Sequence, residues 1–136
     1  MGDVEYIRSC LNRLDEFMSA SGLKVVSQEI LVYSVSYVYA GKYDVLFEDR
    51  RQERYLCDFK TGTSVAPETK LQLAAYDVAS GAGIYRKRYN RMALHLTNKK
   101  CKPVNYLEKG DYDVWLSLVK KYHENMSNYR ENIAGR

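Results

Sequence analysis

The first part of the chain has apolar residues at helical spacing. Five of them stand three or four positions apart: Val4, Ile7, Leu11, Leu14 and Met18. This spacing places them on one face of a helix, with Asp3 as a possible N-cap and Ser21-Gly22 as a stop signal. The pattern therefore predicts an amphipathic helix over residues 4–20.

Residues 24–59 are rich in valine, isoleucine, tyrosine, phenylalanine and leucine, which favour strands. The run is interrupted near Ala40-Gly41-Lys42 and again across residues 48–52. Glycine and clusters of charged residues of this kind mark turns. We expect three strands joined by two hairpins.

The second hairpin has one register that keeps its two faces consistent. It pairs apolar residues with one another: Tyr43 with Phe59, Val45 with Cys57 and Phe47 with Tyr55. On the opposite face Leu46 then lies across from Leu56, and Asp44 lies across from Asp58. A slip of one residue would turn every side chain over, so the apolar pattern favours this register.

The second half of the chain continues with helix and strand patterns. Pro67 fits the first turn of a helix that Gly81 and Gly83 end. Its apolar stripe is Leu71, Ala74, Ala75 and Val78. Residues 91–96 form the next expected strand and residues 104–107 a short further one. Asp111 caps the last expected helix. The stripe of that helix is Trp115, Leu118, Tyr122, Met126 and Tyr129.

The element order is thus α-β-β-β-α-β-(β)-α, within a single domain of residues 1–136. This order predicts an α/β (α+β) fold in which helices flank a central mixed sheet and one helix is added at the C-terminus. The N-terminal segment carries acids where a signal peptide needs basic residues, and no apolar run is long enough to span a bilayer. We expect a cytoplasmic protein with no membrane partner, in the host cytoplasm if the protein is viral. Three scattered cysteines, Cys10, Cys57 and Cys101, suggest neither a disulfide framework nor a metal knuckle.

The net charge of +4 is small, but its distribution is uneven. Between Asp77 and Glu108 there is no acidic residue. The basic residues of that stretch are Arg86, Lys87, Arg88, Arg91, Lys99, Lys100 and Lys102. The asymmetry favours a polyanionic partner such as DNA, whose backbone phosphates these residues would bind. A solvated basic face with no partner is the alternative.

Asp58-Phe59-Lys60 places a carboxylate and an ammonium group on one face of a strand. With Asp44 across the ladder, this face holds two acids and one base. Neighbouring carboxylates repel unless a cation lies between them, and oxygen ligands select Mg²⁺ or Mn²⁺ over zinc. The backbone carbonyl of Phe59 is a further candidate ligand. The alternative interpretation is a surface salt-bridge patch, which is common and contributes little.

A hard dication held there would bind a scissile phosphate and activate a water molecule for phosphodiester hydrolysis. Lys60 would orient this water and offset the charge that develops on the phosphate. Water, rather than a protein side chain, is the expected nucleophile.

Three segments of the chain resemble motifs of a known family. They are Tyr39-Ala40-Gly41-Lys42-Tyr43-Asp44, Cys57-Asp58-Phe59-Lys60-Thr61-Gly62 and Leu71-Gln72-Leu73-Ala74-Ala75-Tyr76. In this order they resemble the G-x-x-D, D-[YF]-K-T-G and Q-x-x-x-Y motifs of the RecB-like nucleases, a branch of the PD-(D/E)XK superfamily that includes many phage exonucleases. The match covers roughly residues 24–97.

The resemblance implies a restriction-endonuclease-like αβββαβ core. It also implies metal ligation by Asp44 and Asp58, a catalytic role for Lys60, and active-site support or DNA contact from Gln72 and Tyr76. His95 and His123 are more typical of structural histidines than of metal ligands.

Glu29 is a weaker candidate metal ligand. Relatives in this family often carry a glutamate at about this place before the first aspartate. If residues 29–37 form a straight strand hairpinned to Asp44, however, Glu29 lies about 20 Å from the partner of Asp44. A structural or substrate-contact role is the alternative, and a water molecule would then complete the site.

The expected function is that of a Mg²⁺-dependent deoxyribonuclease, acting as an exonuclease in phage or bacterial recombination, repair or genome processing. One alternative is a structure-selective or nicking endonuclease on the same fold. Another is a non-catalytic DNA-binding subunit. The intact set of Asp44, Asp58 and Lys60 argues against it, because a lapsed site would have no physical need for paired acids. One compact domain has little mass to enclose DNA, so a homo-oligomer or a recombination or processing partner protein is a further expectation.

Overall fold

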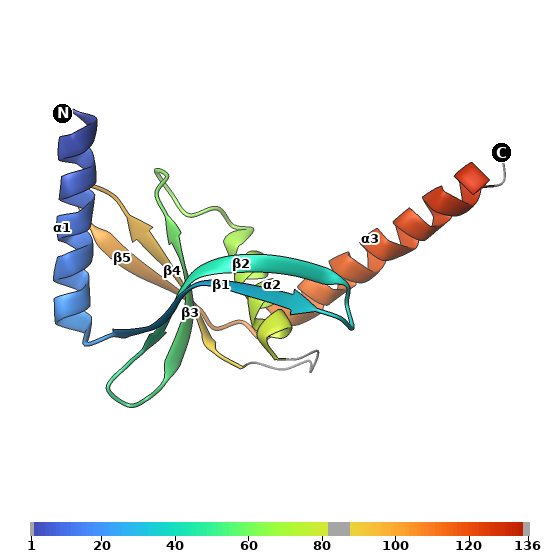
Figure 1. Cartoon of the computed structure of the whole chain (residues 1–136), viewed down its shortest axis with the longest axis horizontal. Coiled ribbons are helices and arrows are strands. Elements are labelled where there is room, and N and C mark those ends of the chain that lie inside the picture. Colours follow the sequence, from blue (N-terminus) through green and yellow to red (C-terminus); the bar gives the residue numbers. More distant parts are fainter. Residues whose placement is uncertain (1, 82–87, 135–136) are drawn as a thin grey trace.

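The computed structural model describes residues 2–81 and 88–134. Along the chain its elements are α1 (Asp3–Ser21), β1 (Lys24–Ser34), β2 (Tyr39–Glu48), β3 (Arg54–Lys60), α2 (Thr69–Ser80), β4 (Asn90–Leu96), β5 (Cys101–Tyr106) and α3 (Gly110–Ala134) (Figure 1). The fold is therefore the mixed α+β fold expected from the sequence, with a five-stranded sheet flanked by helices and a C-terminal helix.

The strands lie in the order β1-β2-β3-β4-β5. Neighbours run antiparallel except β3 and β4, which run parallel. A parallel pair needs a crossover connection, and α2 provides it. Because of this parallel pairing, Lys60 at the end of β3 lies beside His95 near the end of β4.

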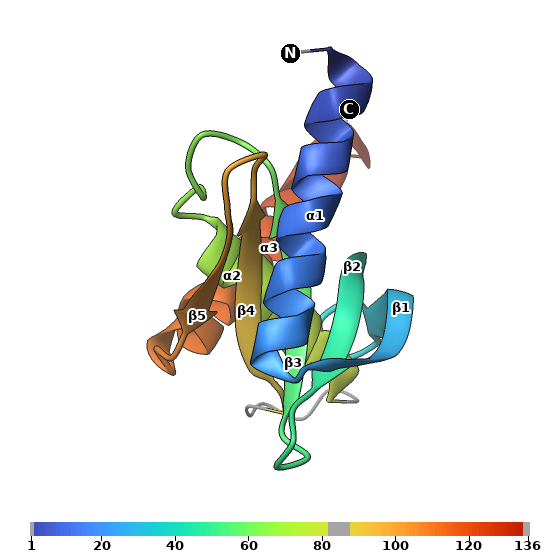
Figure 2. The same cartoon turned by 90° about the vertical axis from the view of Figure 1, so that its left-hand side faces the viewer.

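One face of the sheet packs against α1. The buried residues of this face are Val45, Phe47, Cys57, Met92 and Leu94, and the α1 residues that cover them are Leu14, Phe17 and Met18. Only the C-terminal half of α1 is packed, because Val4, Ile7 and Leu11 of the expected stripe are exposed. The N-terminal half of the helix projects past the sheet (Figure 2). Asp3 lies inside the first turn, and Gly2 occupies the cap position.

The opposite face is covered by α2. Its buried cluster contains Leu46, Leu56 and Ala93 of the sheet and Leu73 and Ala79 of the helix. The helix begins at Thr69, two residues later than expected. Leu73, which has no exposed surface, is the central contact where Leu71 was expected.

The first hairpin turns at residues 35–38, not at the expected residues 40–42. Ser34 pairs with Tyr39 across this turn, and Val38 has a φ of 58°. Gly41 consequently lies within β2, paired with Val32. The glycine at this position makes room for the Tyr76 ring and does not form a turn.

The second hairpin has the register that the apolar pattern predicted, with Val45 paired to Cys57, Leu46 to Leu56 and Phe47 to Tyr55. Asp49 shapes its turn, since its Oδ1 accepts hydrogen bonds from two backbone amides of the turn. The expected face of Tyr43 is wrong, because Tyr43 packs with Leu46 on the α2 side. Beyond β3 the β1–β2 ribbon continues alone and curves over α2 (Figure 1).

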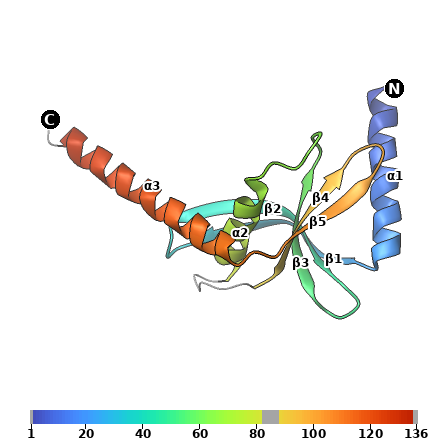
Figure 3. The same cartoon turned by 180° about the vertical axis from the view of Figure 1, so that it is seen from behind.

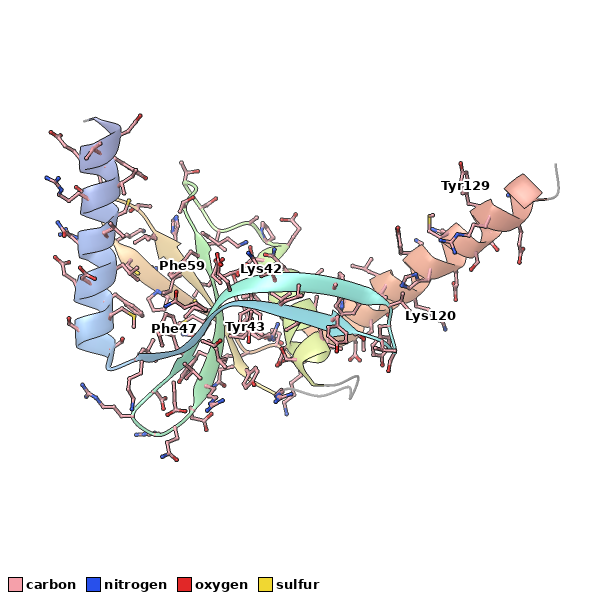
Figure 4. All side chains as sticks on the ribbon, viewed as in Figure 1. Lys42, Tyr43, Phe47, Phe59, Lys120 and Tyr129 are labelled. Atoms are coloured by element: carbon pink, nitrogen blue, oxygen red, sulfur yellow. The ribbon has the colours of Figure 1, made fainter. Side chains whose placement is uncertain are left out.

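The helix α3 extends away from the sheet on the side opposite to α1 (Figures 1 and 3). Among the described side chains of α3, the buried apolar ones are Tyr112 and Val119. Most of the expected stripe is exposed, including Leu118, Tyr122 and Tyr129, and Tyr129 lies on the projecting part (Figure 4). Helical spacing identified the helix correctly, but not which of its residues meet the sheet. No helix in residues 2–81 and 88–134 combines the length and hydropathy needed to cross a membrane.

A buried polar cluster attaches the first turns of α3 to α2. The hydroxyl of Tyr112 donates to Asp77 Oδ2 at 2.6 Å, and the backbone N–H of Tyr89 donates to Asp77 Oδ1 at 3.0 Å. Burial raises the pKa of the Asp77 carboxyl, and these hydrogen bonds oppose the rise. Because α3 is fixed here, Trp115 on its next turn is held beside Tyr39 of β2.

Candidate active site

The candidate site lies where β2 and β3 separate. The backbone N–H of Asp44 donates to Asp58 Oδ1 at 3.0 Å, and the backbone N–H of Phe59 donates to Asp44 Oδ2 at 2.7 Å. Each carboxylate thus accepts an amide proton of the neighbouring strand, in place of the next ladder hydrogen bonds beyond Val45 and Cys57. The two aspartates are therefore brought together, as the register implied.

The Asp58 carboxyl is nearly buried, with 9% of its side chain exposed. Burial raises its pKa to about 6, and the nearby Asp44 carboxylate adds to the rise, while the Asp44 amide and Lys60 oppose it. A buried acid beside a second acid is unfavourable when both are charged. This arrangement is suited to a cation.

Lys60 connects the acid pair to α2. Its Nζ lies 3.7 Å from Asp58 Oδ2 and donates to Gln72 Oε1 at 2.8 Å. Gln72 Nε2 in turn donates to the hydroxyl of Tyr76 at 3.0 Å. Gln72 and Tyr76 are four residues apart on one helix face, so a single hydrogen-bonded chain runs from β3 along α2. The structure thus gathers these candidate residues around Asp44 and Asp58.

Gly41 gives the Tyr76 ring its place. A Cβ at position 41 would lie 2.6 Å from Tyr76 Cε1, which is closer than atoms can pack. The Tyr43 ring packs against the Tyr76 ring, with the two ring centroids 6.0 Å apart. The glycine of the first motif therefore makes room for the tyrosine of the third.

Glu29 is closer to Asp44 in the ladder than expected. Gln28 pairs with Val45 and Ile30 pairs with Tyr43, so Glu29 lies across from Asp44. The expected separation of about 20 Å is wrong because the first hairpin turns earlier than the glycine suggested.

The Glu29 side chain nevertheless points to solvent and toward Lys42, and does not join the acid pair. Its φ is 49°, its side chain is 77% exposed, and its Oε1 lies 3.8 Å from Lys42 Nζ. Within the described ranges, no three His, Cys, Asp or Glu side chains lie together so that they could hold a metal ion. Two carboxylates, without Glu29, make up the acidic part of the site.

The expected DNA-binding set requires a correction at Arg91. This side chain is buried, and its Nη1 donates to Asp111 Oδ2 at 2.9 Å and to the Lys70 carbonyl at 3.0 Å. Its Nη2 donates to the Glu108 carbonyl at 2.8 Å. The guanidinium group therefore fastens β4 to α2 and α3 and is not presented to a DNA backbone.

Of the other basic residues in this set, those that the structure describes do not form one patch. Lys99 and Lys100 are exposed in the turn after β4, at the same end of the sheet as Lys60. Arg88 precedes β4 and lies at the other end, roughly 20 Å away by strand rise, where its guanidinium donates to the Ser80 carbonyl. Arg86 and Lys87 lie outside the described residues.

His95 is a neighbour of the site that the sequence pattern did not single out. Its Nε2 lies 2.6 Å from the Gly62 carbonyl, so it holds the loop that follows Lys60. The other histidine, His123, lies 2.9 Å from the Tyr37 carbonyl. Both contacts are with backbone, which agrees with structural histidines. The parallel pairing of β3 and β4 places His95 beside Lys60, and no local sequence pattern indicates this pairing.

No family model matches the chain, and no curated protein sequence matches it significantly. Among solved structures, the chain is similar to the crystal structure of SSO0001, with 12% identity and a TM-score of 0.44, over 83% of this chain and 57% of that one. It is also similar to part of a cryoEM structure of a DrdV–DNA complex, with 16% identity and a TM-score of 0.28, over 78% of this chain and 10% of that one. The chain thus spans little more than half of the first protein and a tenth of the second. At such identities and TM-scores the likenesses carry no functional information.

Proposed function

We propose that this protein is a metal-dependent DNA nuclease of the RecB-like type that hydrolyses phosphodiester bonds, acting as an exonuclease in recombination, repair or genome processing. The observation that carries the proposal is a pair of hydrogen bonds, in which Asp58 Oδ1 accepts from the Asp44 backbone N–H and Asp44 Oδ2 accepts from the Phe59 backbone N–H. They hold two carboxylates together, and Lys60 Nζ lies 3.7 Å from the Asp58 carboxylate. The three sequence motifs supply its second support.

The donor set fits a hard divalent cation. Magnesium is commonly bound by one or two carboxylates while it keeps several waters, and the acid pair offers that number. Asp44 and Asp58 would hold the ion, together with the Phe59 carbonyl. When bound, Mg²⁺ or Mn²⁺ supplies Lewis-acid stabilisation of phosphate oxygens and makes a bound water more acidic.

Lys60 contributes the positive charge of the protein itself. Because its Nζ is fixed between Asp58 and Gln72, the ammonium group stays at the acid pair and does not sample solvent freely. In this position it offsets the negative charge that develops on the phosphate and orients the attacking water. Gln72 and Tyr76 position Lys60 from α2, and His95 holds the following loop through Gly62.

The test compares linear, circular and single-stranded DNA in the presence of Mg²⁺, Mn²⁺ or chelator. We expect metal-dependent shortening of linear DNA from its ends. Lys60→Ala should lower the rate by about a hundredfold or more, as loss of an electrostatic catalytic group does. Lys109→Ala is the matched control, since Lys109 is exposed and follows β5 at the opposite end of the sheet.

Two outcomes would revise this proposal. If circular DNA is nicked while the ends of linear DNA stay intact, the protein is a nicking endonuclease and not an exonuclease. Tight DNA binding by well-folded wild-type protein, without cleavage in either metal, would indicate a non-catalytic DNA-binding subunit.

A further inference from the structure

A groove of about 460 Å³ lies between β2, α2 and α3. Gln72 and Tyr76 form its wall on the α2 side, and the same two residues form the hydrogen-bonded chain to Lys60. Tyr39 and Gly41 of β2 contribute a second wall, and Trp115 of α3 contributes a third. The groove therefore adjoins the candidate active site through Gln72 and Tyr76, although Asp44, Asp58 and Lys60 do not line it.

The groove is suited to a flat, uncharged ring. Tyr39 and Trp115 meet edge to face with centroids 5.1 Å apart, and the Tyr39 hydroxyl is fixed by a 2.7 Å hydrogen bond to the Ala75 carbonyl. Leu118 lies at the lining and is 48% exposed. Among the described residues that line the groove, the charged one is the acidic Glu68. A phosphate would be repelled there, whereas an uncharged nucleobase brings an aromatic face that can stack on the rings.

We propose that this groove binds an unpaired nucleobase of the DNA strand whose phosphate lies at Asp44, Asp58 and Lys60. The inference rests on the proposed nuclease function and specifies its substrate: a strand with unpaired nucleotides next to the cleaved bond, as in single-stranded DNA or a frayed end. Bases stack on aromatic side chains in this way without regard to sequence. An apolar segment of a partner protein is the competing occupant, but the groove shares Gln72 and Tyr76 with the candidate active site, and this favours a base.

The chain itself carries a reporter of groove occupancy, because Trp115 is its single tryptophan. The fluorescence of Trp115 is measured with three DNA probes. The buffer contains Ca²⁺, a hard cation that takes oxygen ligands. The probes are a single-stranded oligothymidylate, an abasic oligonucleotide of the same length, and a closed circular duplex. We expect the oligothymidylate to quench Trp115 and the other two to leave it unchanged. Equal quenching by the abasic oligonucleotide, or none by the oligothymidylate, would overturn the proposal.

Substitutions at Leu118 and Trp115 test the groove by affinity, measured with a labelled oligothymidylate. Leu118→Glu should weaken binding about tenfold or more, since it places a charge where the base stacks. Leu107→Glu is the matched control, because Leu107 is 81% exposed and does not line the groove. Trp115→Phe keeps an aromatic face and should bind far better than Trp115→Ala. Equal affinities across these variants would contradict the proposal.

The two proposals fail separately. If quenching of Trp115 depends on the base but no metal-dependent hydrolysis occurs, the groove is a base-binding site and the proposed nuclease function is wrong. Hydrolysis with unchanged Trp115 fluorescence would keep the nuclease and remove the groove.

Discussion

Tyr76 lies so close to the backbone of Gly41 that a methyl group at position 41 would come within 2.6 Å of its ring. The ring is not free to retreat, because Gln72 holds its hydroxyl and Tyr43 packs beside it. The first and third motifs therefore meet in space, and their joint presence in the sequence has a packing cause.

Gly41→Ala should displace Tyr76 and lower the free energy of unfolding by about 1–3 kcal/mol, the usual cost of overpacking. Gly110→Ala is the control, since a Cβ there meets nothing within 4 Å. The double variant Gly41→Ala with Tyr76→Leu should recover part of the loss, because it removes the ring edge. Urea unfolding measures the free energy of unfolding of the three variants and of wild type. Equal stability of the two alanine variants would refute the contact.

The Asp58 carboxyl makes the metal-free protein sensitive to pH. Its pKa is raised from 3.8 to about 6 in the fold, so the native state binds the proton more tightly than the unfolded chain does. The associated stability is fully present below pH 4 and is lost as pH rises to about 6. The shift corresponds to roughly 3 kcal/mol as an upper bound.

Unfolding in urea with chelator should therefore show decreasing stability between about pH 4 and pH 6, and Asp58→Asn should flatten this slope. Added Mg²⁺ should restore stability at pH 7 in wild type but not in Asp58→Asn, because a ligand that binds only the folded state stabilises it. Asp15→Asn, at an exposed position of α1, serves as the control. A slope unaffected by Asp58→Asn would assign the pH dependence to other groups.

Glu29→Gln should leave the Mg²⁺ affinity unchanged, because the Glu29 carboxylate faces Lys42 and not the acid pair. Asp44→Asn should lower it strongly, since Asp44 is one of the two carboxylates at the site. Isothermal titration with Mg²⁺ or Mn²⁺ compares them. If Glu29→Gln weakens binding as much as Asp44→Asn does, then Glu29 is a ligand that turns inward when the metal binds.

Arg91→Met should destabilise the protein by about 3–5 kcal/mol, because it leaves the buried Asp111 carboxylate without its partner. Restoring stability by a second change, Asp111→Asn, would identify the uncompensated charge as the cause. The salt dependence of DNA binding, measured on the folded fraction, should not change. A folded Arg91→Met protein with a weaker salt dependence would return Arg91 to the DNA-binding set.

Lys99→Ala combined with Lys100→Ala should weaken DNA binding and reduce the slope of log affinity against log salt by about 1 for each lysine that contacts a phosphate. Both lysines are exposed at the Lys60 end of the sheet, so unfolding should be unaffected. Arg88→Ala changes a basic residue at the far end and should have the smaller effect on the slope. The reverse ranking would place the DNA path across the other edge.

The sequence was sufficient for the elements and for the register of β2 on β3, because both faces of that hairpin carry large apolar side chains that tolerate no slip. The same register brought Asp44 to Asp58. Parallel pairing of β3 with β4, which places His95 beside Lys60, depends on how α2 crosses over and leaves no local signal.

The errors arose where one residue type serves two purposes. Gly41 carries the signature of a turn but accommodates Tyr76, and the true turn at residues 35–38 contains neither glycine nor proline. Arg91 was grouped with surface cations although its charge is used inside the protein. In both cases tertiary contacts, absent from a local pattern, decide the role.

The hydrogen-bond exchange at the fork of β2 and β3 has a consequence for the history of such a protein. Since Asp44 and Asp58 each accept a hydrogen bond from a main-chain amide, a descendant that no longer cut DNA would still use an acceptor side chain at both positions to join its strands. Retained aspartates would then mark an inherited architecture as well as a working enzyme. Lys60, which satisfies no such amide, is the residue whose loss would reveal that the chemistry had been abandoned.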